Sequence, residues 1–168
     1  IWLDPIRMIE MASIIKDELI QLQPKQEDSL NSNFASLKED LLALDKEFEQ
    51  VLSNKQSKKI LVSHAAYGYW EQRYGIKQLA INGISSNSEP SQQDLVHIID
   101  QAKQHDINYI IFEQNVSNKV SKQIQEEIGA TSVTLHNLAV RTTEDIDNDE
   151  DYLSIMEQNL KVLDQVTK

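Results

Sequence analysis

Two histidines are the residues of this sequence best suited to chemistry. His64 follows the apolar run 59–62 and Ser63, and His136 follows the apolar run 131–135. Both runs are short and β-branched, so each histidine is expected at the carboxyl end of a strand, the edge where open α/β sheets bind ligands. A neutral imidazole held there is a good ligand for zinc and similar divalent metals. A single strand-end histidine is more often structural than a ligand, but two at equivalent edges make the structural interpretation less favoured and could converge.

A carboxylate is expected at the same edge. Glu113 ends the apolar run 108–112, and it is either a direct ligand, a surface group or the partner that fixes which nitrogen of a histidine faces the metal. We interpret it as a candidate for that orienting role. The other two histidines, His97 and His105, fall in or just after a helix that starts near Ser91, away from this edge.

Composition narrows the kind of protein. The 168 residues suffice for one domain with a core, or for one domain and part of another. Sixteen basic and 27 acidic residues give a net charge of −11, which argues against binding to nucleic acid. No apolar run reaches the roughly 18 residues that cross a bilayer. With no cysteine, a metal site must use His, Asp, Glu or water.

Common enzyme motifs are missing. The sequence has no glycine-rich phosphate loop, no Gly-x-Ser-x-Gly and no His-Glu-x-x-His, and Ser63 and His64 are strand neighbours that point to opposite faces. We therefore expect no enzyme. The alternative is a metal-dependent or hydrolase-like enzyme built on His64, His136 and Glu113, although no general base is evident beside His64.

The elements that must position these residues follow from periodicity. Helical spacing is found at 5–22, with Asp4 as N-cap and Pro5 as first residue, and at 28–53. Beyond Lys58, the runs at 59–62, 78–82, 108–112 and 131–135 alternate with helical patterns at 65–74, 91–104, 117–128 and 149–166. This order predicts an α/β fold: an open, mainly parallel four-stranded sheet with helices on both faces, preceded by a long connecting helix.

Two further expectations concern the acidic run near the end of the chain and the first residues of the sequence. The acidic run 144–151 lacks the glycine and the distal glutamate of an EF-hand loop, so a solvated loop ahead of the last helix is expected. Because the sequence begins with Ile1 and has no basic and apolar leader, we expect a processed or excised chain whose natural beginning is missing.

Several motifs in one order resemble the zinc- and manganese-binding solute-binding lipoproteins of bacterial ABC transporters, above all their zinc-uptake members. The similarity extends over the whole chain, and its motifs are Trp2-Leu-Asp-Pro5, Leu41-Leu-Ala-Leu-Asp-Lys-Glu-Phe48, Ser63-His-Ala-Ala-Tyr-Gly-Tyr69, Tyr74-Gly75, Glu89-Pro-Ser91 and Tyr152 to Leu163. The resemblance implies two lobes joined by a rigid helix. Residues 1–24 would end a truncated N-terminal lobe, 25–57 would form the interlobe helix, and 58–168 would form the C-terminal metal-binding lobe.

The resemblance also implies a ligand set. In this family the metal lies between the lobes, and two histidines come from the N-terminal lobe, one of them directly before the position of Ile1. His64 matches the third ligand. The fourth is usually an acid in the loop 135–140, where His136 matches the position of Asp in many members and Ala139 that of Glu in some zinc members. Either His136 replaces the acid or water completes the tetrahedron.

The function implied by the resemblance is capture of extracellular zinc and its delivery to an ABC permease, without catalysis. Zinc is the expected cargo and manganese the second candidate. The protein would be a monomer with no membrane-spanning segment, lipid-anchored on the extracellular face of the bacterial membrane or periplasmic. The alternative is a cell-surface adhesion or interaction module whose metal is structural or incidental. With at most two imidazole ligands, the isolated chain is expected to bind zinc weakly.

Overall fold

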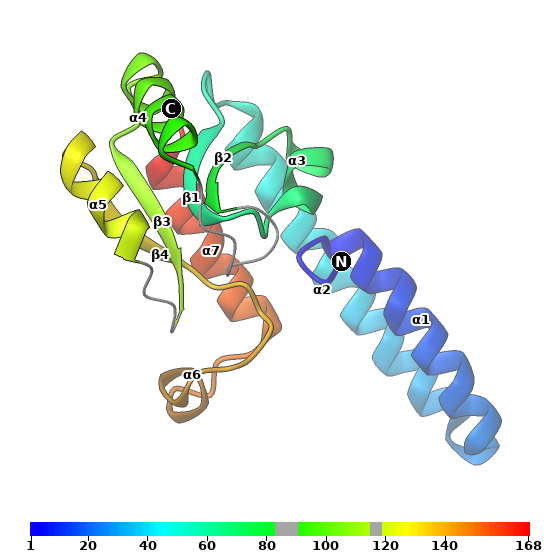
Figure 1. Cartoon of the computed structure of the whole chain (residues 1–168). Coiled ribbons are helices and arrows are strands. Elements are labelled where there is room, and N and C mark those ends of the chain that lie inside the picture. The colour runs from blue at the N-terminus through cyan, green and yellow to red at the C-terminus, as the bar shows by residue number, and fades with distance from the viewer. Residues whose placement is uncertain (83–90, 115–118) are drawn as a thin grey trace.

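The predicted alternation of strands and helices is confirmed in the computed structural model, which describes residues 1–82, 91–114 and 119–168. Its sheet has four parallel strands in the order β2-β1-β3-β4 (Figure 1). They are β1 (Lys59–His64), β2 (Lys77–Asn82), β3 (Tyr109–Glu113) and β4 (Thr131–Leu135). The chain moves outward from β1 to β2 on one side and from β3 to β4 on the other. The order therefore reverses between β1 and β3, which is where ligands bind in sheets of this kind.

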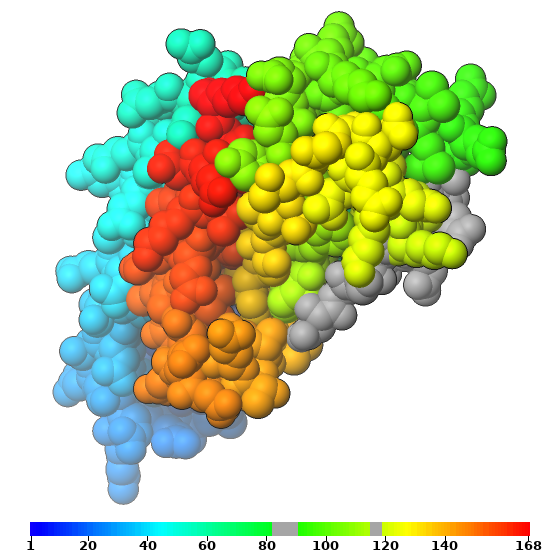
Figure 2. Space-filling model, turned by 90° about the vertical axis from the view of Figure 1, so that its left-hand side faces the viewer, coloured from blue at the N-terminus to red at the C-terminus, as the bar shows by residue number. Residues whose placement is uncertain are grey.

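Helices cover both faces of the sheet, as expected. The helices α2 (Glu27–Ser53), α3 (Gly68–Tyr74) and α7 (Tyr152–Val166) share a core with Ile60 and Val62 on one face. The helices α4 (Gln92–Gln104) and α5 (Lys119–Ile128) share a second core with Leu61 on the other face. Neighbouring residues of β1 thus point to opposite layers. Figure 2 shows α7 (red) lying beside α2 (cyan), so that these two helices form one layer.

The helices α1 (Pro5–Leu22) and α2 form a hairpin through the short 3-10 helix η1 (Pro24–Gln26), and the far end of this hairpin projects from the sheet (Figure 1). Along α1 only Pro5 is buried, whereas Ile14, Ile15, Leu19 and Leu22 are exposed. These side chains form an exposed apolar row on α1. Among the described residues, no helix combines the length and apolar composition needed to cross a bilayer.

The predicted start of α1 is confirmed by its cap. The side chain of Asp4 accepts hydrogen bonds from the backbone N–H groups of Ile6 and Arg7, at 3.0 and 3.3 Å. Replacing Asp4 with alanine leaves both donors without this partner, and we expect the free energy of unfolding to fall by about 1 kcal/mol. Urea denaturation followed by circular dichroism measures the change. Asp4→Asn, which keeps a capping oxygen, should retain most of the stability. An equal loss in both variants would assign the effect to the charge of Asp4 instead.

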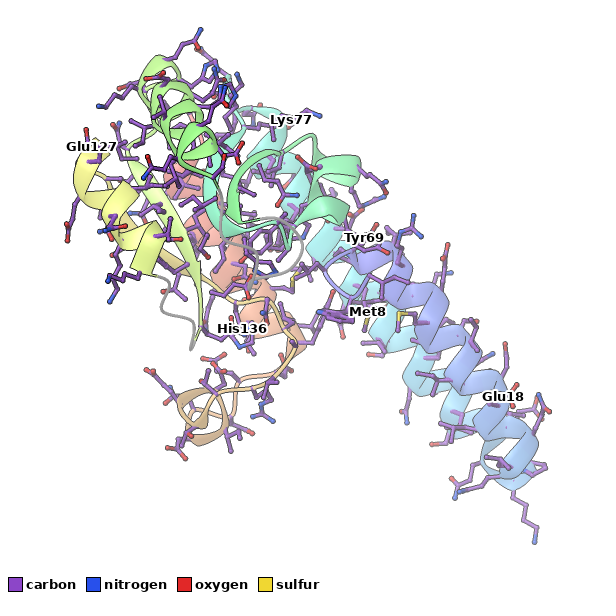
Figure 3. All side chains as sticks on the ribbon, in the orientation of Figure 1. Met8, Glu18, Tyr69, Lys77, Glu127 and His136 are labelled. Atoms are coloured by element: carbon purple, nitrogen blue, oxygen red, sulfur yellow. The ribbon has the colours of Figure 1, made fainter. Side chains whose placement is uncertain are left out.

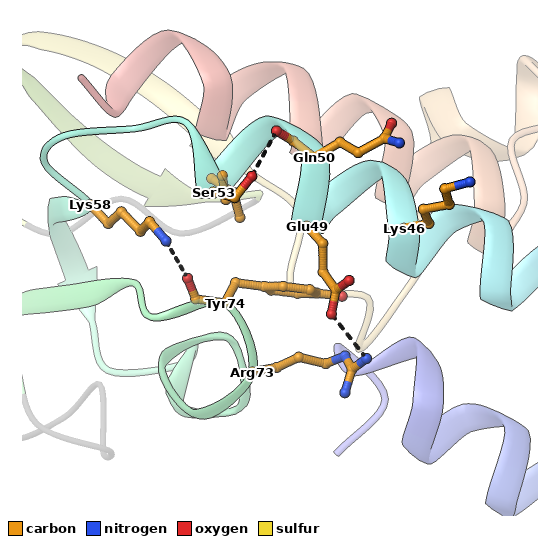
Figure 4. A pocket seen from close by; sticks show the side chains of 8 residues that line it. Lys46, Glu49, Gln50, Ser53, Lys58, Arg73 and Tyr74 are labelled. Atoms are coloured by element: carbon orange, nitrogen blue, oxygen red, sulfur yellow. Dashed lines mark hydrogen bonds and ion pairs between the residues drawn. The ribbon is translucent and has the colours of Figure 1, made fainter.

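Helix α3 fastens the hairpin to the sheet. The guanidinium of Arg73 forms a bidentate ion pair with Asp45 of α2, and the hydroxyl of Tyr74 donates to the same carboxylate at 2.9 Å. A second, exposed carboxylate, Glu49, lies 3.6 Å from the Arg73 guanidinium (Figure 4). The indole of Trp70 donates to the carbonyl of Leu3 at 2.7 Å. The segment before α1 and the middle of α2 are therefore both tied to one short helix.

The two ends of the sheet-bearing part of the chain meet. The backbone N–H of Ser57, just before β1, donates to the carbonyl of Lys168 at 2.6 Å, and the N–H of Lys168 donates back to Ser57 at 2.9 Å. Ser57 precedes the first strand, and Lys168 follows α7. This pair closes the region after α2 into one unit.

The acidic run is not the plain loop that was expected. A short helix, α6 (Thr143–Asp147), lies within it, capped by Thr142 and Asp145, so that part of the prediction is wrong. The helix predicted at 65–74 begins later, at Gly68, and the strand before it extends to His64. Ser91 caps α4 as expected, whereas Glu89, Pro90 and residues 117–118 of the predicted helix lie outside the described residues.

Candidate metal centre

His64 and Glu113 meet at the point where the strand order reverses. In the β1–β3 register Leu61 lies opposite Ile110 and Val62 opposite Ile111, and continuing it places His64 opposite Glu113. Nδ1 of the His64 ring contacts Oε1 of Glu113 directly. The glutamate side chain is 5% exposed and the histidine side chain 21%. The carboxylate is thus the buried member of the pair, and the ring is nearer the solvent.

This pairing determines what the imidazole can offer. A carboxylate beside Nδ1 favours the tautomer with its hydrogen on that nitrogen, which leaves the Nε2 lone pair available. Within the part of the chain that the structure describes, no group is bonded to Nε2 of His64. Metal-binding histidines are commonly oriented by a carboxylate in this way. The arrangement is the one expected for a metal ligand at His64 with Glu113 behind it.

The second oxygen of Glu113 has a partner that sequence reasoning missed. The side-chain amide of Asn137 donates to Oε2 of Glu113 at 2.6 Å. Burial, together with the charge of Glu113, raises the pKa of the neighbouring Tyr67 well above its ordinary value, so this hydroxyl stays protonated and donates to the carbonyl of Leu135 at 3.4 Å. The only signal for Asn137 in the sequence is its position directly after the strand-end histidine, His136.

His136 also lies at the carboxyl edge, where the chain leaves β4 toward α6 (Figure 3). Its backbone N–H and carbonyl both bond the side chain of Asn159, each at 2.8 Å. Nδ1 of the ring accepts from the N–H of Leu138 at 2.9 Å, and Nε2 lies 3.1 Å from the carboxylate of Asp145. Both ring nitrogens are therefore engaged in this arrangement. Metal binding by His136 stays a prediction, and it requires release of one of these two contacts.

Asp145 organises the loop around His136. Burial opposes its ionisation, but hydrogen bonds from the hydroxyl and N–H of Thr142 and from His136 hold its pKa below its ordinary value. Leu138 adopts a left-handed backbone with φ of 57°, which turns its N–H onto the His136 ring. Ala139 is exposed and has no side-chain donor or acceptor, and its backbone N–H donates to Asn137 Oδ1 at 3.0 Å.

The remaining histidines lie away from this edge, as expected. His97 is exposed on α4. His105 caps the end of α4, and its Nε2 lies 2.7 Å from the amino group of Lys59 at the beginning of β1. A cavity of about 480 Å³ also lies near the amino end of β1, lined in part by Lys58 and Tyr74 (Figure 4). No ligand at the carboxyl edge of the sheet comes from His97, His105 or this cavity.

The segment before α1 reaches the same edge as His64. The indole N–H of Trp2 donates to the carbonyl of Asn137 at 2.9 Å, and the hydroxyl of Tyr152 donates to the carbonyl of Trp2 at 2.8 Å. Nearby, the Arg7 guanidinium lies 5.2 Å from the centre of the Tyr69 ring, which Figure 3 places beside the start of α1. The Trp2-Leu-Asp-Pro5 motif therefore lies beside the loop that follows β4.

The described residues hold no group of three or more His, Asp or Glu side chains placed to bind one metal ion. His64 and His136 instead form two separate pairs, one with Glu113 and one with Asp145. Four-coordinate zinc takes His, Asp, Glu or water ligands. Metal binding by His64 stays a prediction, and a complete site would need further ligands.

Comparison with known sequences gives one family and several relatives. The family model for the periplasmic zinc-uptake complex component A matches residues 1–166. The zinc-binding lipoprotein AdcA of Streptococcus pneumoniae is 37% identical over 167 residues, 99% of this chain and 33% of its own length. The high-affinity zinc uptake system protein ZnuA of Bacillus subtilis is 31% identical over 163 residues. The chain spans about a third of AdcA and half (51%) of ZnuA.

Solved structures share the fold over nearly the whole chain. The laminin-binding adhesin Lmb of Streptococcus agalactiae superposes with a TM-score of 0.88 at 34% identity, covering 99% of this chain and 62% of Lmb. The Zn(II)-bound ZnuA-like domain of Streptococcus pneumoniae AdcA superposes with a TM-score of 0.82 at 36% identity, again covering 99% and 62%.

Proposed function

Because this chain belongs to the family of the zinc-uptake complex component A, we propose that it binds zinc as the cargo of an ABC transporter. In this proposal it captures extracellular zinc, delivers the ion to a permease and catalyses no reaction. The observation that carries the proposal is the His64 ring, held through Nδ1 by buried Glu113 at the point where the strand order reverses. An imidazole ligand suits zinc better than manganese, which favours oxygen ligands.

We further propose that the chain is part of a two-lobed protein. Residues 1–24 would end an N-terminal lobe, 25–57 would carry the connecting helix, and 58–168 would form the C-terminal metal-binding lobe. Two observations support this division: the exposed apolar row on α1, and the coverage of only 62% of the ZnuA-like domain of AdcA. The remaining zinc ligands would come from the other lobe, next to the segment that Trp2 holds at the carboxyl edge.

The proposed location is the extracellular face of the bacterial membrane, through a lipid anchor, or the periplasm. Relatives named zinc-binding lipoproteins support the anchor. The proposed partner is an ABC permease, and the full protein is proposed to be a monomer.

Replacing His64 with alanine tests this function. In the full-length protein that contains this chain, we expect zinc affinity to fall about 100-fold, or about 2.7 kcal/mol, because one imidazole ligand is lost. Competition titration against a zinc indicator measures the affinity, and growth in zinc-depleted medium measures uptake. His97→Ala, an exposed histidine on α4, is the matched control and should change neither. Tight stoichiometric binding that survives His64→Ala would contradict the site.

A second candidate function is adhesion to an extracellular protein. The observation that favours it is the 34% identity to laminin-binding proteins of Streptococcus agalactiae and Streptococcus pyogenes, with TM-scores of 0.88 and 0.87. Surface plasmon resonance on immobilised laminin tests it. Binding by the wild-type chain that His64→Ala leaves unchanged would show adhesion independent of the metal site, whereas no binding would leave transport as the function.

A further inference from the structure

We propose that Asn137 is a positioning residue of the zinc site, which acts on His64 through Glu113. Its amide holds the Glu113 carboxylate so that the carboxylate keeps the proton of His64 on Nδ1 and presents Nε2 to the metal. The inference rests on the proposed zinc function. It assigns a role to a residue of the loop after β4 that does not itself touch the ion.

The orientation of the Asn137 amide is fixed by its own partners. Its Oδ1 accepts from the backbone N–H of Ala139 at 3.0 Å and lies 2.7 Å from Nε2 of Gln114. A backbone N–H can only donate, so the atom that faces Ala139 must be the oxygen. The Nδ2 group must then face Glu113, where it lies 2.6 Å from Oε2.

That orientation determines the role of one glutamate oxygen. An amide N–H donates and cannot accept, so it requires an acceptor oxygen at Oε2 of Glu113. The Glu113 side chain is nearly buried, and its other oxygen, Oε1, faces Nδ1 of His64. In the proposed arrangement both carboxylate oxygens are acceptors, so that the proton of His64 is on Nδ1 and the lone pair on Nε2.

The backbone of Asn137 is anchored from two other parts of the chain. Its N–H donates to the Gln114 side chain at 3.0 Å, and its carbonyl accepts from the indole of Trp2 at 2.9 Å. Gln114 directly follows Glu113 at the end of β3, and Trp2 precedes α1. The amide therefore has little freedom to follow Glu113 if that carboxylate moves. These two backbone contacts survive a change of side chain, whereas the contacts of Oδ1 with Ala139 and Gln114 are kept by Asn137→Asp and lost in Asn137→Ala.

The test uses two substitutions and one control in the metal-free chain. Asn137→Asp keeps the shape but places a carboxylate against Glu113, and Asn137→Ala removes the amide and keeps the backbone contacts. Asn148→Asp makes the same charge change at the exposed end of α6 and is the matched control. The ¹⁵N chemical shifts of the His64 ring, recorded at a pH at which the ring is neutral, report which nitrogen holds the proton.

We expect the wild-type chain and Asn148→Asp to hold the His64 proton on Nδ1, and both Asn137 variants to shift population toward the Nε2–H form. Zinc affinity of the Asn137 variants should fall about 10- to 100-fold, the usual range for residues that orient metal ligands. Unchanged ring shifts would overturn the proposal even if affinity falls, because a purely structural effect on the loop does not move the proton. Unchanged affinity would also overturn it.

His64→Ala separates this proposal from the function on which it rests. If zinc binding survives His64→Ala, the proposed site fails. If His64→Ala abolishes binding while the Asn137 variants keep the wild-type ring shifts, only the positioning role of Asn137 fails. Circular dichroism of each variant shows whether it is folded, and the alanine variant stands in for Asn137→Asp should the second carboxylate prevent folding.

Discussion

Replacing Trp70 with alanine is expected to lower the free energy of unfolding by about 4 kcal/mol, because a large buried side chain is lost and a cavity remains. The Trp70 side chain is fully buried in α3, and its ring stacks on Tyr67 at 5.1 Å and packs against Phe48 at 5.9 Å. The substitution also leaves the carbonyl of Leu3 without its indole donor. Urea denaturation monitored by circular dichroism measures the loss.

The other tryptophan provides the control for this result. Trp2 is 43% exposed and also donates one indole hydrogen bond, to Asn137. Trp2→Ala should therefore cost only about 1 kcal/mol, the value of one hydrogen bond and some surface packing. Equal losses in the two variants would show that the packing of α3 against α2 and the sheet contributes less to the free energy of unfolding than the burial of Trp70 indicates.

Replacing Arg73 with alanine is the second large effect, with an expected loss of about 3 kcal/mol, because removing one partner leaves a buried charge uncompensated. Asp45 is 6% exposed and, among the residues that the structure describes, would keep the hydroxyl of Tyr74 as its hydrogen-bond partner. Burial and the Asp45 charge raise the pKa of Tyr74 well above its ordinary value, so this hydroxyl stays a donor and cannot supply a positive charge. The chain should unfold at a lower urea concentration than wild type.

Two variants sharpen the Arg73 result. Arg73→Lys should recover only part of the stability, since a lysine cannot make the bidentate contact to Asp45. Glu49→Ala removes the exposed partner of Arg73 and should change the free energy of unfolding by less than about 1 kcal/mol. If Glu49→Ala matched Arg73→Ala, the exposed contact and not the buried pair would fasten α3 to α2.

Most of the fold could be predicted because its signals are local. The β-branched runs at 59–62 and 131–135 lie within β1 and β4, and Asp4 and Ser91 cap α1 and α4 as their types indicate. Helix α6 was missed because its five residues are acidic and too short to show a periodic apolar face. Its one signal is the spacing of Thr142 and Asp145, which forms a capping box.

The candidate site could be predicted only in part. Strand ends indicated His64, Glu113 and His136 at one edge, but a sequence does not state which strands are neighbours. The observed order places β1 beside β3, and this is why His64 meets Glu113 while His136 pairs with Asp145. Asn137 could not be identified in advance because its role depends on contacts from Trp2, Gln114 and Glu113, which lie far from it in the sequence.

The backbone pair between Ser57 and Lys168 has a consequence for how this unit can be combined with others. The polypeptide enters the sheet-bearing unit at Ser57 and leaves it at Lys168, at a single corner away from the His64 edge. A module with adjacent ends can be fused to, or inserted into, another protein without stretching its strands apart. A further segment joined at this corner would leave the edge that carries His64 uncovered.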